Sequence, residues 1–230
     1  MKNTFADRVI TFNETLIFTD SLPEHFQVVN PFQDNPEVMT PVRQFYKKFY
    51  DDNQPRRMIL GINPGRHGAA VSGVPFTDTK RLESVCGITI ENAYSHELSS
   101  VFVYDMIAAY GGVEAFYSRF YINSPFPLAI IQQNKAGKWV NANYYDYPEL
   151  FEAVRPFMVA SMKKHLSKGV LTDKAFVLGK KNAQFIAKIN DEFHFFDELI
   201  PLDHPRFIQQ YKSKERDIYI NEYIEKLGGG

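Results

Sequence analysis

The most constraining feature of this 230-residue chain is a glycine- and proline-rich stretch, GINPGRHGAAVSGVPF, at residues 61–76. It follows the apolar run RMIL at residues 57–60, which predicts a short buried strand. Four glycines and two prolines within sixteen residues exclude a regular amphipathic helix here. The chain therefore leaves a buried strand for an irregular loop, as chains do where an α/β sheet binds a ligand beyond the carboxyl ends of its strands.

Predicted strands alternate with predicted helices along the rest of the chain. The sequence predicts strands in 56–62, 99–110 and 195–205, helices in 2–18, 43–50, 77–86, 147–169 and 214–227, a strand, glycine turn and helix across 174–189, and irregular structure in 120–131. In the helix at 147–169 we expect a kink or a helix start near Pro156. Such alternation is typical of a parallel sheet with helices on both faces.

We therefore expect a three-layer α/β/α sandwich around a short central parallel sheet. Residues 1–230 are predicted to form a single domain, with a helical N-terminal extension at 1–28 and a flexible tail at 228–230. The chain is 44% hydrophobic and 15% aromatic, which is typical of a folded globular protein and excludes a disordered one.

Charge and cysteine content limit the classes of partner and compartment. The formal net charge is −1, so any binding of nucleic acid has to depend on local basic clusters. The single cysteine, Cys86, excludes an intramolecular disulfide and favours a reducing, cytoplasmic location. Asp7 and Glu14 interrupt any apolar leader at the N-terminus, and no later stretch is long enough to span a bilayer, so we expect no membrane partner.

Three irregular segments follow predicted strands, and each carries one polar side chain suited to a small planar ligand. These side chains are Asn63, Asn123 and His204, and a proline lies within two residues of each. None is persuasive alone, because a lone Asn after a strand usually caps a turn and a lone His is more often structural. The loop at 61–76 lacks the GK[ST] ending of a phosphate-binding P-loop and does not match G-x-G-x-x-G.

Together these segments resemble the uracil-DNA glycosylase superfamily, and within it most closely the single-strand-selective monofunctional branch. The first motif of that branch, G-M-N-P-G-P-F-G-M-A-x-T-G-V-P-F, is in register with residues 61–76. The second motif of the superfamily begins His-Pro, as residues 204–205 do, and its Asn before Cys-Pro-Leu compares with Asn123 in INSPFPL. The likeness extends from about Asn30 to Arg206.

The resemblance implies a uracil-DNA glycosylase fold and hydrolysis of the N-glycosidic bond of uracil, or of a 5-substituted uracil, in DNA during base excision repair. By this resemblance Asn63 positions the attacking water, and His204 donates a hydrogen bond to uracil O2, as a neutral imidazole, while charge develops on the base. Asn123 pairs with N3–H and O4 of the base, because one amide supplies both an acceptor and a donor. Phe76 stacks on the base, and no metal or cofactor takes part.

Two further positions in the first motif bear on the base pocket. Backbone N–H groups near Gly65 and Arg66 are expected to reach O2. Other branches of the superfamily place a Tyr where this chain has Gly65, so the resemblance implies room for a substituent on C5 of uracil.

The resemblance breaks in two places. Arg66 and His67 stand where the branch has Pro-Phe. After His-Pro the superfamily continues with Ser-Pro-Arg-Asn-Pro, the start of a wedge that enters the DNA stack, whereas this chain has Arg206-Phe207-Ile208. The wedge is therefore absent or rebuilt.

Four residues after the second motif are candidates for DNA contact: Arg206, Phe207, Lys212 and Lys214. Arg206 and Phe207 could replace the wedge, and the two lysines could contact phosphates. A core position for Phe207 and a solvated helix start for the lysines are the alternatives.

The expected partner is DNA containing uracil or a modified uracil, bound by a monomer, with a preference for single strands left open. The histidines His67, His96, His165, His194 and His204 lack the close spacing of metal ligands, so no metal site is expected. Two other functions remain open: a catalytically weak or inactive relative that binds nucleic acid or a base, and a hydrolase of a free nucleoside or another small N-glycoside.

Overall fold

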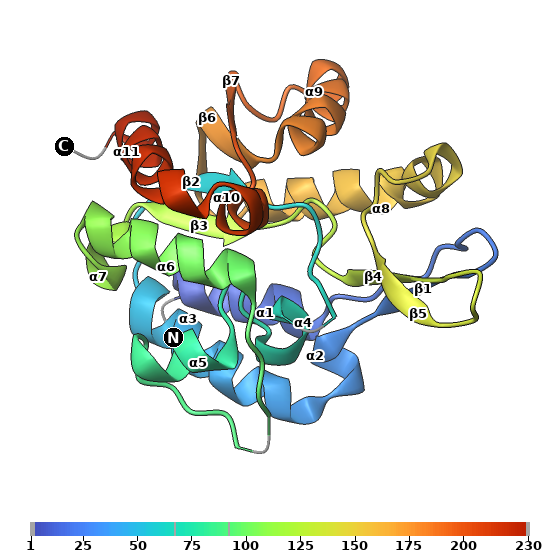
Figure 1. The fold of residues 1–230 in the computed structure, drawn as a ribbon, viewed down its shortest axis with the longest axis horizontal. Helices are drawn as coiled ribbons and strands as arrows, with labels where there is room; N and C mark the ends of the chain where they lie inside the picture. Colours follow the sequence, from blue (N-terminus) through green and yellow to red (C-terminus); the bar gives the residue numbers. More distant parts are fainter. Residues whose placement is uncertain (1–2, 67, 92, 229–230) are drawn as a thin grey trace.

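The computed structural model describes residues 3–66, 68–91 and 93–228 (Figure 1). His67 and residues 229–230 of the expected flexible tail lie outside these described residues. A four-stranded parallel sheet lies at the centre, with strand order β3-β2-β6-β7. Its strands are β2 (Arg56–Leu60), β3 (Phe120–Asn123), β6 (Val170–Leu178) and β7 (Glu198–Leu202).

Helices flank this sheet, in keeping with the buried apolar runs that end its two inner strands, residues 58–60 in β2 and 175–178 in β6 (Figure 1). The helices are α1 (Phe5–Glu14), α2 (Pro31–Asp34), η1 (Pro36–Val38), α3 (Met39–Tyr50), α4 (Ala69–Ser72), α5 (Thr79–Ser84), α6 (Leu98–Tyr110), α7 (Val113–Tyr117), α8 (Pro148–Leu166), α9 (Lys180–Phe193), α10 (Pro205–Tyr211), η2 (Ser213–Glu215) and α11 (Arg216–Leu227). The expected α/β class with a parallel sheet flanked by helices is confirmed. Within the described residues, no helix combines the length and the apolar character needed to cross a membrane.

A second, antiparallel sheet was not expected from the sequence. It has the order β1-β4-β5 and consists of β1 (Phe26–Val29), β4 (Ala129–Gln133) and β5 (Trp139–Ala142). β4 and β5 form a hairpin whose turn carries Gly137 at φ +73°, a conformation that favours glycine. The segment 120–131, expected to be irregular, therefore contains β3 and the start of β4.

The strand predicted at 99–110 is wrong, because these residues belong to helix α6. Phe102, Val103, Met106 and Ile107 are buried on one face of the helix. The opposite face is apolar as well, because it carries the exposed Ala108 and Ala109. A helix that is apolar nearly all round loses the 3.6-residue periodicity by which a surface helix is recognised.

The remaining expected elements agree with the structure. Helix α5 begins after Asp78, whose carboxylate accepts the Arg81 backbone N–H at 2.9 Å. Helix α8 begins at Pro148 and continues past Pro156, rather than starting near it. Gly179, with φ +98°, makes the turn between β6 and α9.

Candidate active site

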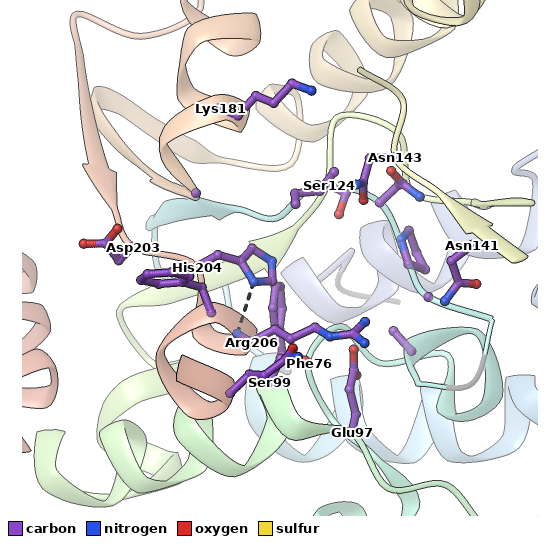
Figure 2. A pocket seen from close by; sticks show the side chains of 18 of the residues that line it. Phe76, Glu97, Ser99, Ser124, Asn141, Asn143, Lys181, Asp203, His204 and Arg206 are labelled. Carbon is purple, nitrogen blue, oxygen red and sulfur yellow. Dashed lines mark hydrogen bonds between the residues drawn. The ribbon is translucent and has the colours of Figure 1, made fainter. Parts of the chain in front are cut away.

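A cavity of about 780 Å³ opens at the carboxyl ends of the parallel strands (Figure 2). Residues beyond the last residue of each strand line it: Ile62 to Gly65 after β2, Ser124 after β3, Gly179 after β6 and Asp203 after β7. This is the edge at which open α/β sheets bind their ligands.

Most of the residues singled out in the sequence meet at this cavity. Asn63, Gly65, Phe76, His204, Arg206, Phe207 and Lys212 line it. Arg66, Asn123 and Lys214 are not among its lining residues. Residues 61–76 and the His-Pro step therefore come together as expected, whereas Asn123 requires a separate account.

The Asn63 amide is held at both of its ends by backbone groups of the last residue of β5 and of the segment just after it. Its Nδ2 donates to the Ala142 carbonyl at 3.0 Å, and its Oδ1 accepts the Tyr144 N–H at 3.1 Å. The neighbouring Arg66 N–H donates to Asn141 Oδ1 at 3.1 Å, so this expected donor already has a partner. The antiparallel sheet thus fixes the orientation of a side chain from the parallel sheet.

Tyr144 and Asn182 tie the same segment to the strand ends. The Tyr144 hydroxyl donates to Asn182 Oδ1, and both side chains are fully buried. Asn182 Nδ2 in turn donates to the carbonyls of Gly61 and Leu178, each at 3.1 Å. Buried backbone groups at the ends of β2 and β6 are satisfied in this way, and the loop holding Asn63 gains a rigid support.

Phe76 lies beside His204 with its backbone in the left-handed region, at φ +54°. The two ring centroids are 5.9 Å apart and tilted by 48°. A Cβ at Gly61 would lie 2.9 Å from Cε2 of Phe76, so the ring occupies space that only glycine leaves open. An aromatic residue in this region is strained by about 1–3 kcal/mol, and such strain is found mainly at functional sites.

His204 caps helix α10 and is a neutral imidazole. Burial, together with the smaller effect of the nearby positive charge of Arg206, lowers the pKa of His204 to about 4. Nδ1 accepts the Arg206 backbone N–H at 3.1 Å, so the proton of the neutral ring resides on Nε2.

Asn123 lines a second, much smaller cavity that shares Pro64, Ala69 and Pro75 with the first. Its Nδ2 donates to the Tyr121 hydroxyl at 2.7 Å, and its Oδ1 accepts the Ser124 N–H at 2.8 Å. Three of the four side chains expected around one cavity therefore share it, while Asn123 lies in the adjacent one.

A buried histidine extends this network. His165 Nδ1 lies 3.2 Å from the Tyr121 hydroxyl, and Nε2 lies 3.3 Å from the Ser124 carbonyl. Burial holds the pKa of His165 well below its usual value, so the ring is neutral. The carbonyl can only accept, which places the proton on Nε2, makes Nδ1 the acceptor for Tyr121, and leaves Tyr121 to accept from Asn123.

Sequence reasoning missed several lining residues, of which Glu97 is the most unusual. Its Oε2 is buried and has no hydrogen-bond partner among the described residues, and burial raises the pKa of its carboxyl group. Figure 2 shows the carboxyl group and the Arg206 guanidinium directed toward one another. Gly68 lies so close that a Cβ there would be 2.3 Å from Oε2. Glu97 directly precedes the helix mistaken for a strand, which removed any reason to expect it here.

Other lining residues not singled out in the sequence carry polar or charged groups, and these are Ser99, Ser124, Asn141, Asn143, Tyr145, Lys180, Lys181, Asp203, Gln210, Tyr211 and Tyr219. Asn141 and Asn143 belong to the unexpected antiparallel sheet and the segment after it. Within the part of the chain that the structure describes, no group of three or more His, Cys, Asp or Glu side chains is arranged to hold a metal ion.

The loop at 61–76 and the His204–Pro205 step meet at the carboxyl ends of a parallel sheet, and this combination is characteristic of one class of protein. A family model of the uracil DNA glycosylase superfamily matches residues 47–228, and the chain belongs to this superfamily. Among solved structures, the chain is similar to the crystal structure of wild-type SMUG2 from Pedobacter heparinus, with a TM-score of 0.96 and 46% sequence identity. That match covers 99% of this chain and 98% of that one. The comparison with curated proteins found no match. The resemblance inferred from residues 61–76 is confirmed.

Proposed function

We propose that this protein is a DNA glycosylase that hydrolyses the N-glycosidic bond of uracil, or of a 5-substituted uracil, in DNA. Membership of the superfamily and similarity to SMUG2 support this assignment. The observation that carries it is that Asn63, Phe76 and His204 line one cavity at the strand ends. In this proposal the chain acts in base excision repair as a single-domain monomer, without a metal or cofactor.

The proposed reaction breaks the bond between sugar C1′ and the base nitrogen. The sugar becomes cation-like, the base leaves with the bonding electron pair, and water adds to C1′ and loses a proton, which neutralises the released base. Asn63 holds this water: after its bonds to Ala142 and Tyr144, the amide keeps one N–H and one oxygen lone pair to offer. An amide is too weak a base to take the proton early, so its contribution is to position the water.

His204 stabilises the departing base. Its Nε2–H donates to uracil O2, where negative charge accumulates, and a donor already oriented for that charge needs no reorganisation during the reaction. A pKa of about 4 keeps the ring neutral near pH 7, so it acts as a hydrogen-bond donor and not as a cation.

Base recognition is assigned to Phe76 and Asn123. Phe76 stacks on the base, which contributes roughly 1–3 kcal/mol in related aromatic contacts. Asn123 retains one N–H and one lone pair beyond its bonds to Tyr121 and Ser124, which match uracil O4 and N3–H. Because Asn123 lines the smaller cavity, this role requires the two adjacent cavities to join when the base binds.

Gly65 sets the proposed tolerance for a substituent on C5 of uracil. A Cβ at this position would meet only Asn141 Nδ2, at 3.5 Å, so the space beside it is open. We expect excision of both uracil and 5-hydroxymethyluracil, and loss of the larger substrate in Gly65→Tyr. Complete rejection of 5-hydroxymethyluracil by the unmodified protein would contradict this part of the proposal.

The experiment that tests the function uses a DNA oligonucleotide with one uracil. An alkali-labile abasic product, formed equally in the presence of a chelator, is the expected result. Asn63→Ala should nearly abolish product while its circular dichroism spectrum and unfolding midpoint stay close to those of the unmodified protein. Binding without product would instead favour an inactive relative. Release of uracil from deoxyuridine but not from DNA would favour a hydrolase of small N-glycosides.

A further inference from the structure

Helix α10 begins at the His204–Pro205 step and carries two aromatic rings on one face. Phe207 and Tyr211 are four residues apart, which places them on neighbouring turns, and their ring centroids are 5.7 Å apart. The adjacent Ile208 is fully buried, and α10 packs against α6 (Figure 1). The helix that carries the two rings is therefore held in place beside the cavity.

Both rings are exposed to solvent and both line the cavity. Phe207 is 42% exposed and Tyr211 is 67% exposed. Among the described residues, the other exposed large apolar side chains are Ile17, Val85, Tyr94, Leu98, Tyr147 and Ile218, and none of these lines the cavity. Paired exposed rings at the mouth of a cavity are more informative than apolar residues scattered singly over a surface.

The charges around the rings suit a polyanion. The charged lining residues are the cations Lys180, Lys181, Arg206 and Lys212 and the carboxylates Glu97 and Asp203. Lys180 lies 3.3 Å from Asp203, and Lys212 lies 3.1 Å from Glu215, so both cations are partly compensated. Four cations against two carboxylates still leave more positive than negative side chains at the cavity. This excess is confined to the cavity, since the whole chain has a net charge of −1.

We propose that Phe207 and Tyr211 form a stacking platform for the unpaired base next to the nucleotide whose base is excised. This inference rests on the proposed function and assigns to that site a subsite for the neighbouring nucleotide. The lining of the cavity, whose volume is about 780 Å³, extends beyond His204 along α10 to Tyr211 and Lys212, past the residues assigned to the excised base. Every base has a π-face, so such a platform tolerates any neighbouring sequence.

The platform favours single strands for a physical reason. In a duplex the neighbouring base is already paired and stacked, so moving it onto the rings has to offset the loss of those interactions. In a single strand that cost is small. Removing the rings should therefore weaken binding to single strands more than binding to the matching duplex.

The test removes the base and the rings separately and measures affinity by fluorescence anisotropy. One oligonucleotide carries a single uracil, and two others carry in addition an abasic tetrahydrofuran unit immediately 5′ or 3′ of it. All binding is measured in the Asn63→Ala background, so that the substrate is not consumed. For intact rings, one of the two abasic substitutions should weaken binding roughly 5- to 150-fold, the range that a lost base–aromatic stack gives.

In the Phe207→Ala/Tyr211→Ala variant the same abasic substitution should change affinity by less than about twofold, because the stack it removes no longer exists. Tyr94→Ala is the matched control: that ring is 80% exposed and does not line the cavity, so the loss should stay as large as with intact rings. If the double alanine variant is poorly folded, the corresponding leucine variants replace it.

An equal effect of the abasic unit in both proteins, or no effect on either side of the uracil, would overturn the platform. So would failure of the protein with intact rings to bind any oligonucleotide. Uracil release by the unmodified protein is scored separately, so a glycosylase without a platform is distinguishable from a protein that is not a glycosylase.

Discussion

The backbone N–H of Arg206 donates a hydrogen bond to Nδ1 of His204, with 3.1 Å between the two nitrogens. An imidazole nitrogen that accepts a hydrogen bond cannot itself carry the proton, so the neutral ring is protonated on Nε2. Arg206 also lowers the pKa of His204 through its charge, secondary to the effect of burial. A single residue, two positions further along the chain, thus sets the tautomer and favours the neutral form.

The first prediction concerns the pH dependence of uracil release. Because the pKa of His204 is about 4, kcat/KM should not respond to this residue between pH 8 and about 5. Below that, protonation of Nδ1 breaks its bond with the Arg206 N–H, and activity should fall through about pH 4. The check is a pH–rate profile on a single-uracil oligonucleotide. A step near pH 6.5 that disappears in His204→Gln would show that the ring titrates normally and would contradict the assignment.

The second prediction concerns stability. His165 and His204 both have pKa values lowered by burial, whereas in the unfolded chain each titrates near 6.5. As pH falls below 6.5, these two histidines bind protons in the unfolded state but remain neutral in the folded state, so the free energy of unfolding should decrease. For His204 this loss should extend down to about pH 4. Urea denaturation at pH 7.5, 6, 5 and 4.5 measures it, and replacing His204 by Gln should make the dependence shallower.

A third prediction separates two glycines of the first motif. In Gly61→Ala the new Cβ would lie 2.9 Å from Cε2 of Phe76, so the ring has to move away from its place beside His204. If Phe76 stacks on the base, kcat/KM should fall by about tenfold or more. In Gly65→Ala the nearest atom is Asn141 Nδ2 at an ordinary 3.5 Å, and kcat/KM should stay within about twofold. Equal behaviour of the two variants would mean that the position of Phe76 does not matter.

The fourth prediction concerns the hydrogen bonds by which Tyr144 holds the segment that orients the Asn63 amide. Tyr144→Phe leaves the buried Asn182 Oδ1 without the hydroxyl that donates to it, which should cost about 1–3 kcal/mol in the free energy of unfolding. The lost hydroxyl bond also anchors the backbone whose N–H donates to Asn63 Oδ1, so the Asn63 amide should be oriented less well. Under conditions where the variant is folded, kcat should therefore drop more than KM rises. Tyr147→Phe is the control: its side chain is half-exposed, and the variant should unfold within about 0.5 kcal/mol of the unmodified protein. A stable, fully active Tyr144→Phe would show that the support is dispensable.

The sequence predicted the elements whose signals are local. The apolar run at 57–60 followed by glycines and prolines indicated a strand end, and the agreement of residues 61–76 with a known motif indicated the family. His204 was singled out because the same family pairs a His-Pro step with that motif, and it lines the same cavity as Asn63 and Phe76. These features depend on residues adjacent in the chain, so no knowledge of tertiary packing was needed.

The errors occurred where packing determines the structure. The run at 99–110 is apolar on nearly every side, although α6 packs against α7, α10 and α11 and leaves Ala108 and Ala109 exposed. A short continuous apolar run does not distinguish strand from helix. The hairpin of β4 and β5 had a usable signal in the glycine turn near Gly137, but nothing in the sequence indicated that Asn141 would reach the loop at 61–76. Contacts of that kind arise only when two sheets are assembled.

The two hydrogen bonds that orient the Asn63 amide also determine when, during synthesis, the site can form. The atoms that orient its amide belong to residues 79 and 81 positions further along the chain. During synthesis the ribosome releases the motif well before it makes those partners, which belong to the hairpin of β4 and β5 and the residues just after it. A nascent or truncated polypeptide that ends before residue 142 therefore contains Asn63 but lacks the backbone groups that orient its amide. We expect such a polypeptide to be inactive toward nucleic acid.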